Sequence, residues 1–226
     1  ITNGGNAGLM VTATKLDPND KKLTLVCVEE DREGFSKGRL LEKIGLKGQD
    51  TSELFFEDVR VPMTNCLGEE GKGFRYILAG MNAERILIAS ECIGDAKWFI
   101  EKAVGYAKER VLFGRPIGQN QGVQFPIAQA YMEVRAADLM RYEACRLFDA
   151  GEPCGAEANM AKHLAADASW KAANACMQTF GGFGFAAEYD VERKFRETRL
   201  YQVAPISANM ILSYVGEHVL GMPRSF

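Results

Sequence analysis

A glutamate followed by an arginine, in the stretch from Met81 to Ala89, is the position with the clearest capacity for chemistry. The register of this stretch is helical, and most positions around Glu84 are small or apolar. A carboxylate in such dry surroundings has a raised pKa and can accept a proton near neutral pH. The alternative is a structural or surface glutamate paired with Arg85, and the local stretch alone favours that alternative. Whether Glu84 is a general base therefore depends on the remaining chain.

The cysteines and histidines are not spaced as metal ligands or as a disulfide framework. There is no CxxC pair, and the two histidines, His163 and His218, are isolated from each other. Structural zinc sites use closely spaced ligand pairs, and chains of this size rarely depend on disulfides. We expect no metal site. The six cysteines are interpreted as reduced thiols of a reducing compartment: Cys27, Cys66, Cys92, Cys145, Cys154 and Cys176.

Composition and charge are those of an ordinary globular protein. The 226 residues are 47% hydrophobic and 25% charged, enough for one large domain or two small ones. The formal net charge is −3, from 27 basic and 30 acidic residues, so nucleic acid is not an expected partner. No apolar run is long enough to cross a bilayer. The chain opens at Ile1 without a signal peptide, and we expect a further segment to precede it.

The first part of the chain, residues 1–70, is predicted to be a small β domain. Short β-type runs at residues 9–16, 23–28 and 54–61 alternate with turn-prone segments. The clearest turn is Asp17-Pro18-Asn19-Asp20, because proline fixes φ and aspartate bonds to the following backbone. We expect a partial, barrel-like β domain.

The second part, residues 71–226, is predicted to be an antiparallel four-helix bundle, which makes the fold class α+β. Apolar residues recur at helical spacing over about residues 73–110, 123–150, 156–180 and 207–220. Short breaks rich in glycine and proline separate these segments, including a loop at residues 113–122. Leucines at helical spacing are expected in the core or between helices, among them Leu139, Leu147, Leu164 and Leu212.

Five motifs occur in an order that resembles the acyl-CoA dehydrogenase family of flavoproteins. They are ITNGG (1–5), FEDVRVP (56–62), GKGF (71–74), RVLFGRPI (110–117) and QTFGGFGF (178–185). Each motif alone is weakly specific, whereas the ordered set spans nearly the whole chain. The resemblance implies the family's middle β domain followed by its C-terminal helical domain, with FAD as cofactor and an acyl-CoA as substrate.

The resemblance also implies a mechanism and a place for its base. A carboxylate takes the proton next to the thioester carbonyl, and a hydride leaves the neighbouring carbon for the flavin. Most members carry the base before the last helix, where this chain reads YQVAPISAN (201–209) and has Pro205. A minority, resembling isovaleryl-CoA and long-chain acyl-CoA dehydrogenases, carries it on the first long helix before an arginine. Glu84 falls at that position and is the implied catalytic residue.

The implied substrate contacts are Asn82, Arg85 and Ile206. A backbone N–H at the position of Pro205 helps to bind the thioester carbonyl in the family, and proline has none. The amide of Ile206 or a flavin hydroxyl would then have to replace it.

The implied flavin contacts have structural alternatives. Arg110 matches a pyrophosphate contact or is a helix C-terminal cation, and Phe113 matches an adenine-side contact or is a core aromatic. Gly181 and Gly182 match a segment reaching the neighbouring subunit's flavin or are a helix C-cap, and Ser207 matches a flavin contact or is an N-cap. The full implied set is Thr2, Arg110, Phe113, Gln121, Gln178, Gly181, Gly182, Ser207 and Asn209.

Three functions stay open at this point. The leading one is an acyl-CoA dehydrogenase that passes electrons to an electron-transferring flavoprotein. The alternatives are an acyl-CoA oxidase or flavin monooxygenase on the same fold, and a non-catalytic binding protein with the family fold. Flavin contacts shared between subunits imply a homo-dimer or homo-tetramer. Bacterial cytoplasm and mitochondrial matrix both fit the resemblance.

Overall fold

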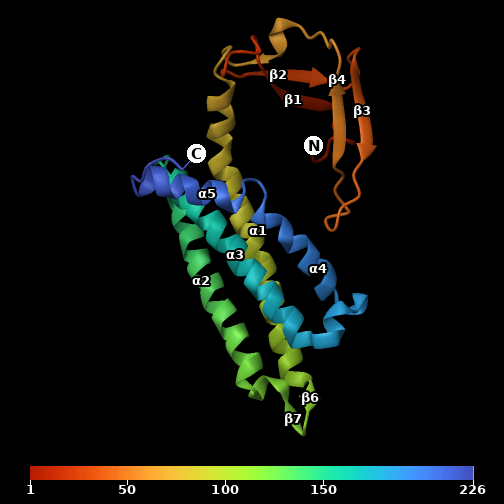
Figure 1. Ribbon diagram of the computed structural model, residues 1–226, viewed down its shortest axis with the longest axis vertical. Coiled ribbons are helices and arrows are strands. Elements are labelled where there is room, and N and C mark those ends of the chain that lie inside the picture. The colour runs from red at the N-terminus through yellow and green to blue at the C-terminus, as the bar shows by residue number, and fades with distance from the viewer. Residues whose placement is uncertain (226) are drawn as a thin grey trace. The chain divides into compact units, whose positions relative to one another are not determined.

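The computed structural model describes residues 1–225 and combines helix and sheet. The chain forms two compact units, Ile1–Met81 and Asn82–Phe226, which meet within the first long helix, α1 (Gly73–Glu109). Figure 1 shows most of the strands in the first unit, and most of the helices together with one short β hairpin in the second.

The β unit contains two separate antiparallel sheets. One has the order β1-β2-β5 and the other pairs β3 with β4. No pairing joins the two sheets within residues 1–81, so these strands form no closed barrel, and the β domain expected from the sequence to be partial and barrel-like consists of two small sheets. The strands are β1 (Leu9–Thr14), β2 (Thr24–Glu29), β3 (Phe35–Leu40), β4 (Ser52–Phe56) and β5 (Cys66–Leu67).

The predicted turn between the first two strands is confirmed. The Asn19 backbone N–H donates to Asp17 Oδ1 at 2.8 Å, and the Asp20 N–H donates to the Asp17 carbonyl at 3.0 Å. The aspartate thus closes the turn with side chain and backbone together. β3 was not predicted, because its sequence FSKGRL lacks the alternation of apolar and polar residues that marks a strand.

Three long helices dominate the second unit: α1, α2 (Gln121–Asp149) and α3 (Gly155–Phe180). Consecutive long helices run antiparallel (Figure 1). Two short helices follow, α4 (Val191–Thr198) and α5 (Ala208–Tyr214), and α5 continues into a π-helical turn. No helix within residues 1–225 is long and apolar enough to span a membrane.

Alanine, rather than leucine, is the commonest residue in the core between the long helices. On α3 the buried alanines recur every three or four residues and let the neighbouring helices approach closely. They are Ala158, Ala161, Ala165, Ala168 and Ala172. Larger side chains, including Phe99 and Val134, complete the core.

The prediction that four named leucines lie in the core or between helices holds within this chain for only one of them. Leu147 is buried, whereas Leu139, Leu164 and Leu212 are 66%, 44% and 55% exposed. On α2, Leu139 lies beside the buried Ala137 and Asp138 but on the outer face of the helix. The helix faces that pack inward are lined mainly by alanine, and these three leucines lie on the opposite, exposed faces.

A tight alanine interface should not accept a larger side chain. Ala137→Leu is expected to lower the free energy of unfolding by about 1–3 kcal/mol, because Ala137 is 1% exposed and the three added carbon atoms cannot be accommodated without strain. Ala136→Leu, one residue earlier on the exposed face, is the control and should change stability by less than about 0.5 kcal/mol. Denaturant unfolding of the intact protein measures both. Equal losses would contradict close packing at Ala137.

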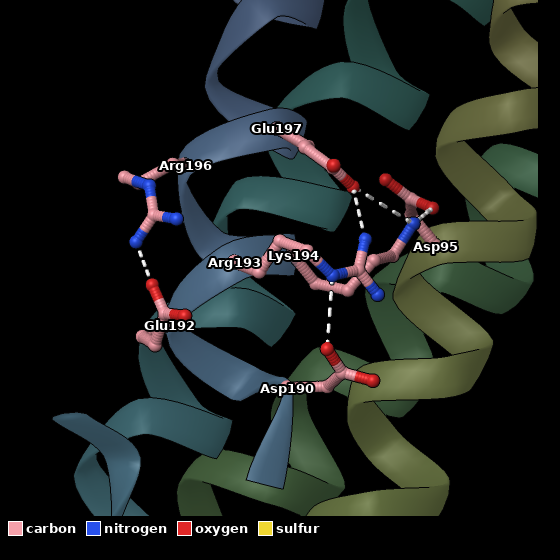
Figure 2. Close-up of polar contacts among 7 residues, drawn as sticks. All are labelled: Asp95, Asp190, Glu192, Arg193, Lys194, Arg196 and Glu197. Carbon is pink, nitrogen blue, oxygen red and sulfur yellow. Dashed lines mark hydrogen bonds and ion pairs between the residues drawn. The ribbon is translucent and has the colours of Figure 1, made fainter. Parts of the chain in front are cut away.

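An ion-pair network fastens α4 to α1 (Figure 2). Lys194 on α4 pairs with Asp95 on α1, and these two side chains are 20% and 10% exposed. Lys194 also lies 4.0 Å from Glu197, and Arg193 pairs with Asp190 and Glu197 along α4 itself. Among the ion pairs of residues 1–225 that involve α4, the contact with Asp95 is the one that joins α4 to α1. It therefore holds α4, and the loop that follows α4, against the first long helix.

Candidate active site and cofactor-binding end

The residues predicted to do chemistry in the helical unit fall at its two ends. Glu84 and Arg110 are 26 positions apart on α1 and the residue that follows it, a separation of about 39 Å at about 1.5 Å per residue. α5 lies toward the Glu84 end, and the hairpin of β6 (Val111–Leu112) and β7 (Arg115–Pro116) lies at the Arg110 end (Figure 1). The two groups are therefore two separate sites.

Next to Glu84, the guanidinium of Arg85 is buried with few hydrogen-bond partners. Arg85 is 8% exposed, and its Nη1 donates to Asn82 Oδ1 at 3.0 Å. Its Nε is buried without a hydrogen-bond partner among the described residues, an arrangement that costs about 1–3 kcal/mol. Burial lowers the pKa of the Arg85 guanidinium, while Tyr214 and Glu84 act in the opposite direction. The structure thus brings together Asn82, Glu84, Arg85 and α5, and leaves one donor for a further acceptor.

The surroundings of Glu84 are wetter than the sequence indicated. Its side chain is exposed, so the dry setting expected from the small and apolar neighbours is not built by the described residues. The reason is helical geometry: Ile86 and Ala89 turn their side chains into the core, and Glu84 faces away from it. A base at this position would rely on bound substrate and cofactor to exclude water.

A second carboxylate on α1 was missed by the sequence analysis. Glu91 lies seven residues after Glu84, two helical turns along nearly the same face. Glu91 is exposed as a whole, but partial burial of its carboxylate raises its pKa, and the nearby Asp95 raises it further. Asp95 lies four residues later on the same helix, so that part of the shift could be read from the sequence, whereas the burial follows only from the tertiary structure.

The segment before α5 is held from within the helical unit. Lys162 on α3, 1% exposed, donates from Nζ to the carbonyls of Tyr201 and Ile206 at 2.6 and 2.8 Å. The Ser207 hydroxyl accepts a long hydrogen bond from the Met210 N–H at 3.4 Å and caps α5. Ser207 is therefore an N-cap, which was one of the two roles that the sequence suggested for it. Asn209, on the first turn of α5, is exposed.

The other end of the unit is a short hairpin that displays an aromatic ring. β6 (Val111–Leu112) pairs with β7 (Arg115–Pro116), in the segment predicted to be a loop. Phe113 and Gly114 form its turn with φ values of 52° and 79°, the positive pair that a two-residue hairpin turn requires. Phe113 is fully exposed, which excludes the core-aromatic alternative in this chain. The turn therefore holds an exposed phenylalanine at a position where asparagine, aspartate or glycine is usual.

Cationic and amide groups surround this hairpin. The Arg110 guanidinium lies 5.8 Å from the Phe183 ring centroid. Gln121 is exposed on the first turn of α2, and Gln178 is exposed near the end of α3. Gln121 follows the end of the hairpin by five residues, and both side-chain amides can offer donors and acceptors to a ligand.

The glycines that end α3 leave room for a ligand. Gly181 has φ 57° and ψ −132°, a conformation that favours glycine, and it caps α3. No atom lies within 4 Å of where a Cβ would stand at Gly181 or Gly182. The glycines thus cap the helix and expose backbone for close approach, so the two interpretations are compatible.

Thr2 belongs to the β unit. It forms an isolated antiparallel bridge with Thr51, and its side chain is exposed. The bridge fixes the backbone at the start of the chain and leaves the hydroxyl free to contact a ligand.

The cysteines show no sign of a redox or metal function. All six are free thiols, and Cys92, Cys154 and Cys176 are buried. Burial raises the pKa of Cys176 to about 12 and that of Cys92 as well, which keeps both thiols protonated and unreactive. Within residues 1–225 no three potential ligands gather as a metal site.

The comparisons with known proteins establish the family. The sequence model of the acyl-CoA dehydrogenase C-terminal domain matches residues 71–220. This chain belongs to the acyl-CoA dehydrogenase family, and it carries that domain. The resemblance inferred from the five motifs is thereby confirmed.

Several relatives cover almost the whole chain. An acyl-CoA dehydrogenase of Bacillus subtilis (strain 168) is 39% identical over 98% of this chain and 59% of the relative. The mitochondrial short/branched chain specific acyl-CoA dehydrogenase of Rattus norvegicus is 34% identical over 97% and 51%. The structure of butyryl-CoA dehydrogenase from Megasphaera elsdenii superposes with a TM-score of 0.92 at 33% identity, over 97% of this chain and 58% of that one. The chain thus spans between 51% and 59% of these relatives.

Proposed function

We propose that the intact protein is a flavin-dependent acyl-CoA dehydrogenase in which Glu84 is the catalytic base. One observation carries the proposal: Pro205 stands where most of the family has glutamate, and Glu84 stands at the alternative position on α1. Because a glutamate is absent at position 205 but present at position 84, the catalytic base has been relocated, which differs from a degraded site that has no base at either position. Relatives named acyl-CoA dehydrogenase in a bacterium and in a mitochondrion support the activity.

The residues at the Glu84 end suit proton abstraction from a thioester. Glu84 would take the proton from the α-carbon, and the Ile206 N–H would bind the thioester carbonyl, where negative charge develops. Asn82 and Arg85 would orient the substrate, with the unpartnered Arg85 Nε as a ready donor. FAD, when bound, supplies the acceptor for the hydride lost from the β-carbon.

The chemistry of the opposite end fits the ADP part of FAD. Arg110 offers a guanidinium for the pyrophosphate, and Gly181 and Gly182 offer accessible backbone for close approach. Phe113 offers an exposed ring for stacking on adenine. Gln121 and Gln178 would add hydrogen bonds. Ser207 and Asn209, next to α5, would contact the flavin portion of FAD. Thr2, in the β unit, would contact the flavin portion as well, as the family resemblance implies.

The separation of the two ends favours a homo-oligomer. Two sites about 39 Å apart along one helix would serve two different flavins more readily than one. The Arg110 end would then complete the site of another copy, in a homo-dimer or a homo-tetramer. We further propose that the helical unit is the four-helix bundle of the family, with α4 and α5 together completing α1, α2 and α3. An electron-transferring flavoprotein is the proposed acceptor, in bacterial cytoplasm or mitochondrial matrix.

Anaerobic titration of the intact holoenzyme with a panel of acyl-CoAs tests the proposed function. Bleaching of the flavin spectrum by at least one acyl-CoA is the expected result. Rapid reoxidation of the reduced flavin by air would point to an oxidase or monooxygenase instead. A flavin that binds but that no acyl-CoA bleaches would support a binding protein and refute the dehydrogenase.

Arg110→Met should weaken retention of FAD. Loss of one charge-assisted contact to the pyrophosphate is expected to raise the Kd for FAD by about tenfold to a hundredfold. Equilibrium binding of FAD to the apoprotein, followed by flavin fluorescence, measures the change. Lys108→Met removes an exposed cation two residues earlier and serves as control, with less than about a twofold effect. Equal effects of both substitutions would show that Arg110 contributes only general charge.

A further inference from the structure

Lys162 is the most deeply buried charged side chain that the mechanism above leaves unused. It lies on the alanine-lined face of α3 and is 1% exposed. Burial lowers the pKa of its ammonium, an effect that the nearby Cys92 only partly opposes. No carboxylate among the described residues forms an ion pair with Lys162, so backbone carbonyls are its partners. Lysine is almost never buried without a specific role, because its desolvation is unfavourable.

Both partners of Lys162 belong to the segment that precedes α5. The ammonium donates to the carbonyl of Tyr201, where the segment begins, and to that of Ile206, where it ends. One turn further along α3, the Ala166 carbonyl accepts from Gln202 Nε2 at 2.9 Å. Successive turns of one helix thus fasten the segment at three points.

This segment contains the two positions on which thioester binding depends. Pro205 cannot donate an N–H, and the next backbone donor is that of Ile206. A donor in a loop is effective only if the loop holds it in place before the substrate arrives. Lys162 donates to the carbonyl oxygen of Ile206, and Ile206 is also the residue whose N–H would bind the thioester.

We propose that Lys162 is a positioning residue for the thioester-binding segment: its ammonium joins the carbonyls of Tyr201 and Ile206 and so fixes the Ile206 amide. This inference rests on the proposed function for the role of the amide. The anchoring itself is a property of the helical unit, and it can be measured without turnover.

The test compares Lys162→Met with the parent in the intact holoenzyme. Methionine keeps the length of the side chain and removes all donors. Amide hydrogen exchange of residues 201–209 should accelerate by about tenfold or more, because three restraints are reduced to one. The affinity for an acyl-CoA whose β-carbon is replaced by sulfur, and which cannot lose a hydride there, should fall by about tenfold.

Two further variants separate positioning from general stability. Lys162→Arg retains charge and donors and should recover part of the analogue affinity. Lys171→Met removes a half-exposed lysine of the same helix, which pairs with Glu133 and Asp167, and should leave exchange in residues 201–209 and analogue affinity unchanged. A role confined to folding would lower the unfolding midpoint of Lys162→Met without a selective change in that segment.

Each outcome decides the inference. Unchanged exchange and affinity in Lys162→Met would overturn it, as would a loss seen only in thermal stability. If Lys162→Met does not fold, Lys162→Leu, which also removes all donors, is measured in its place, and unchanged exchange and affinity there would overturn the inference. A parent holoenzyme that no acyl-CoA bleaches would refute the proposed function, while faster exchange in Lys162→Met would still establish the anchoring.

Discussion

Replacing Glu84 with glutamine is expected to slow flavin reduction by an acyl-CoA by about 10³-fold, while the affinity for the substrate stays within about threefold of the parent. Glutamine has nearly the shape of glutamate and keeps its hydrogen-bonding capacity, but it cannot accept the α-proton. The loss therefore falls on the chemical step and not on binding. Stopped-flow reduction of the intact holoenzyme under anaerobic conditions gives the rate, and the amplitude against substrate concentration gives the affinity.

Glu91→Gln is the informative comparison for that experiment. Glu91 is the carboxylate on α1 whose pKa is raised by burial and by Asp95, so pKa alone would make it the preferred base. The family motif instead selects Glu84, which stands beside Arg85. We expect Glu91→Gln to retain flavin reduction within about tenfold. If the rate of flavin reduction falls by about 10³-fold in Glu91→Gln and not in Glu84→Gln, the catalytic base is Glu91 and the assignment to Glu84 is wrong.

The parts of the fold that were predicted from sequence are those encoded by local patterns. The turn at Asp17 and the three long helices are specified by residues within a few positions of each other. The sheet arrangement depends on which strands pair, and nothing local distinguishes a barrel from two small sheets. α4 was missed because its sequence VERKFRET is mostly charged and has only two apolar residues to suggest a buried face.

The leucine error has a different cause. Hydrophobic periodicity identifies a helix but does not say which of two apolar faces is covered. In α3 the small residues face inward, and Leu164 is left at the surface. The same alanine-rich pattern conceals Lys162, whose position within the run of buried alanines was the only available signal of its burial. Its partners, at Tyr201 and Ile206, are 39 and 44 residues away and follow only from the tertiary structure.

Lys194→Met is expected to lower the free energy of unfolding of the intact protein by about 3 kcal/mol, the largest stability effect that we anticipate. The substitution keeps the length of the side chain and leaves Asp95, a carboxylate that is 10% exposed, without its ion-pair partner. Asp95 Oδ2 is already buried with no hydrogen-bond partner among the described residues, so it has little to replace the ammonium. Denaturant unfolding measures the loss.

Two companion variants distinguish a buried charge from an exposed network. Arg193→Met removes two ion pairs from the same helix, but Arg193 is 45% exposed and its pair with Asp190 is largely in solvent, so a loss below about 1 kcal/mol is expected. The double substitution Asp95→Asn with Lys194→Met should recover most of the loss, because no unpaired charge is then left inside. A double variant as unstable as Lys194→Met would mean that the lysine contributes by packing its methylene stem. Losses of equal size in Lys194→Met and Arg193→Met would mean that water reaches Asp95, and α4 would then be held to α1 by its apolar contacts alone.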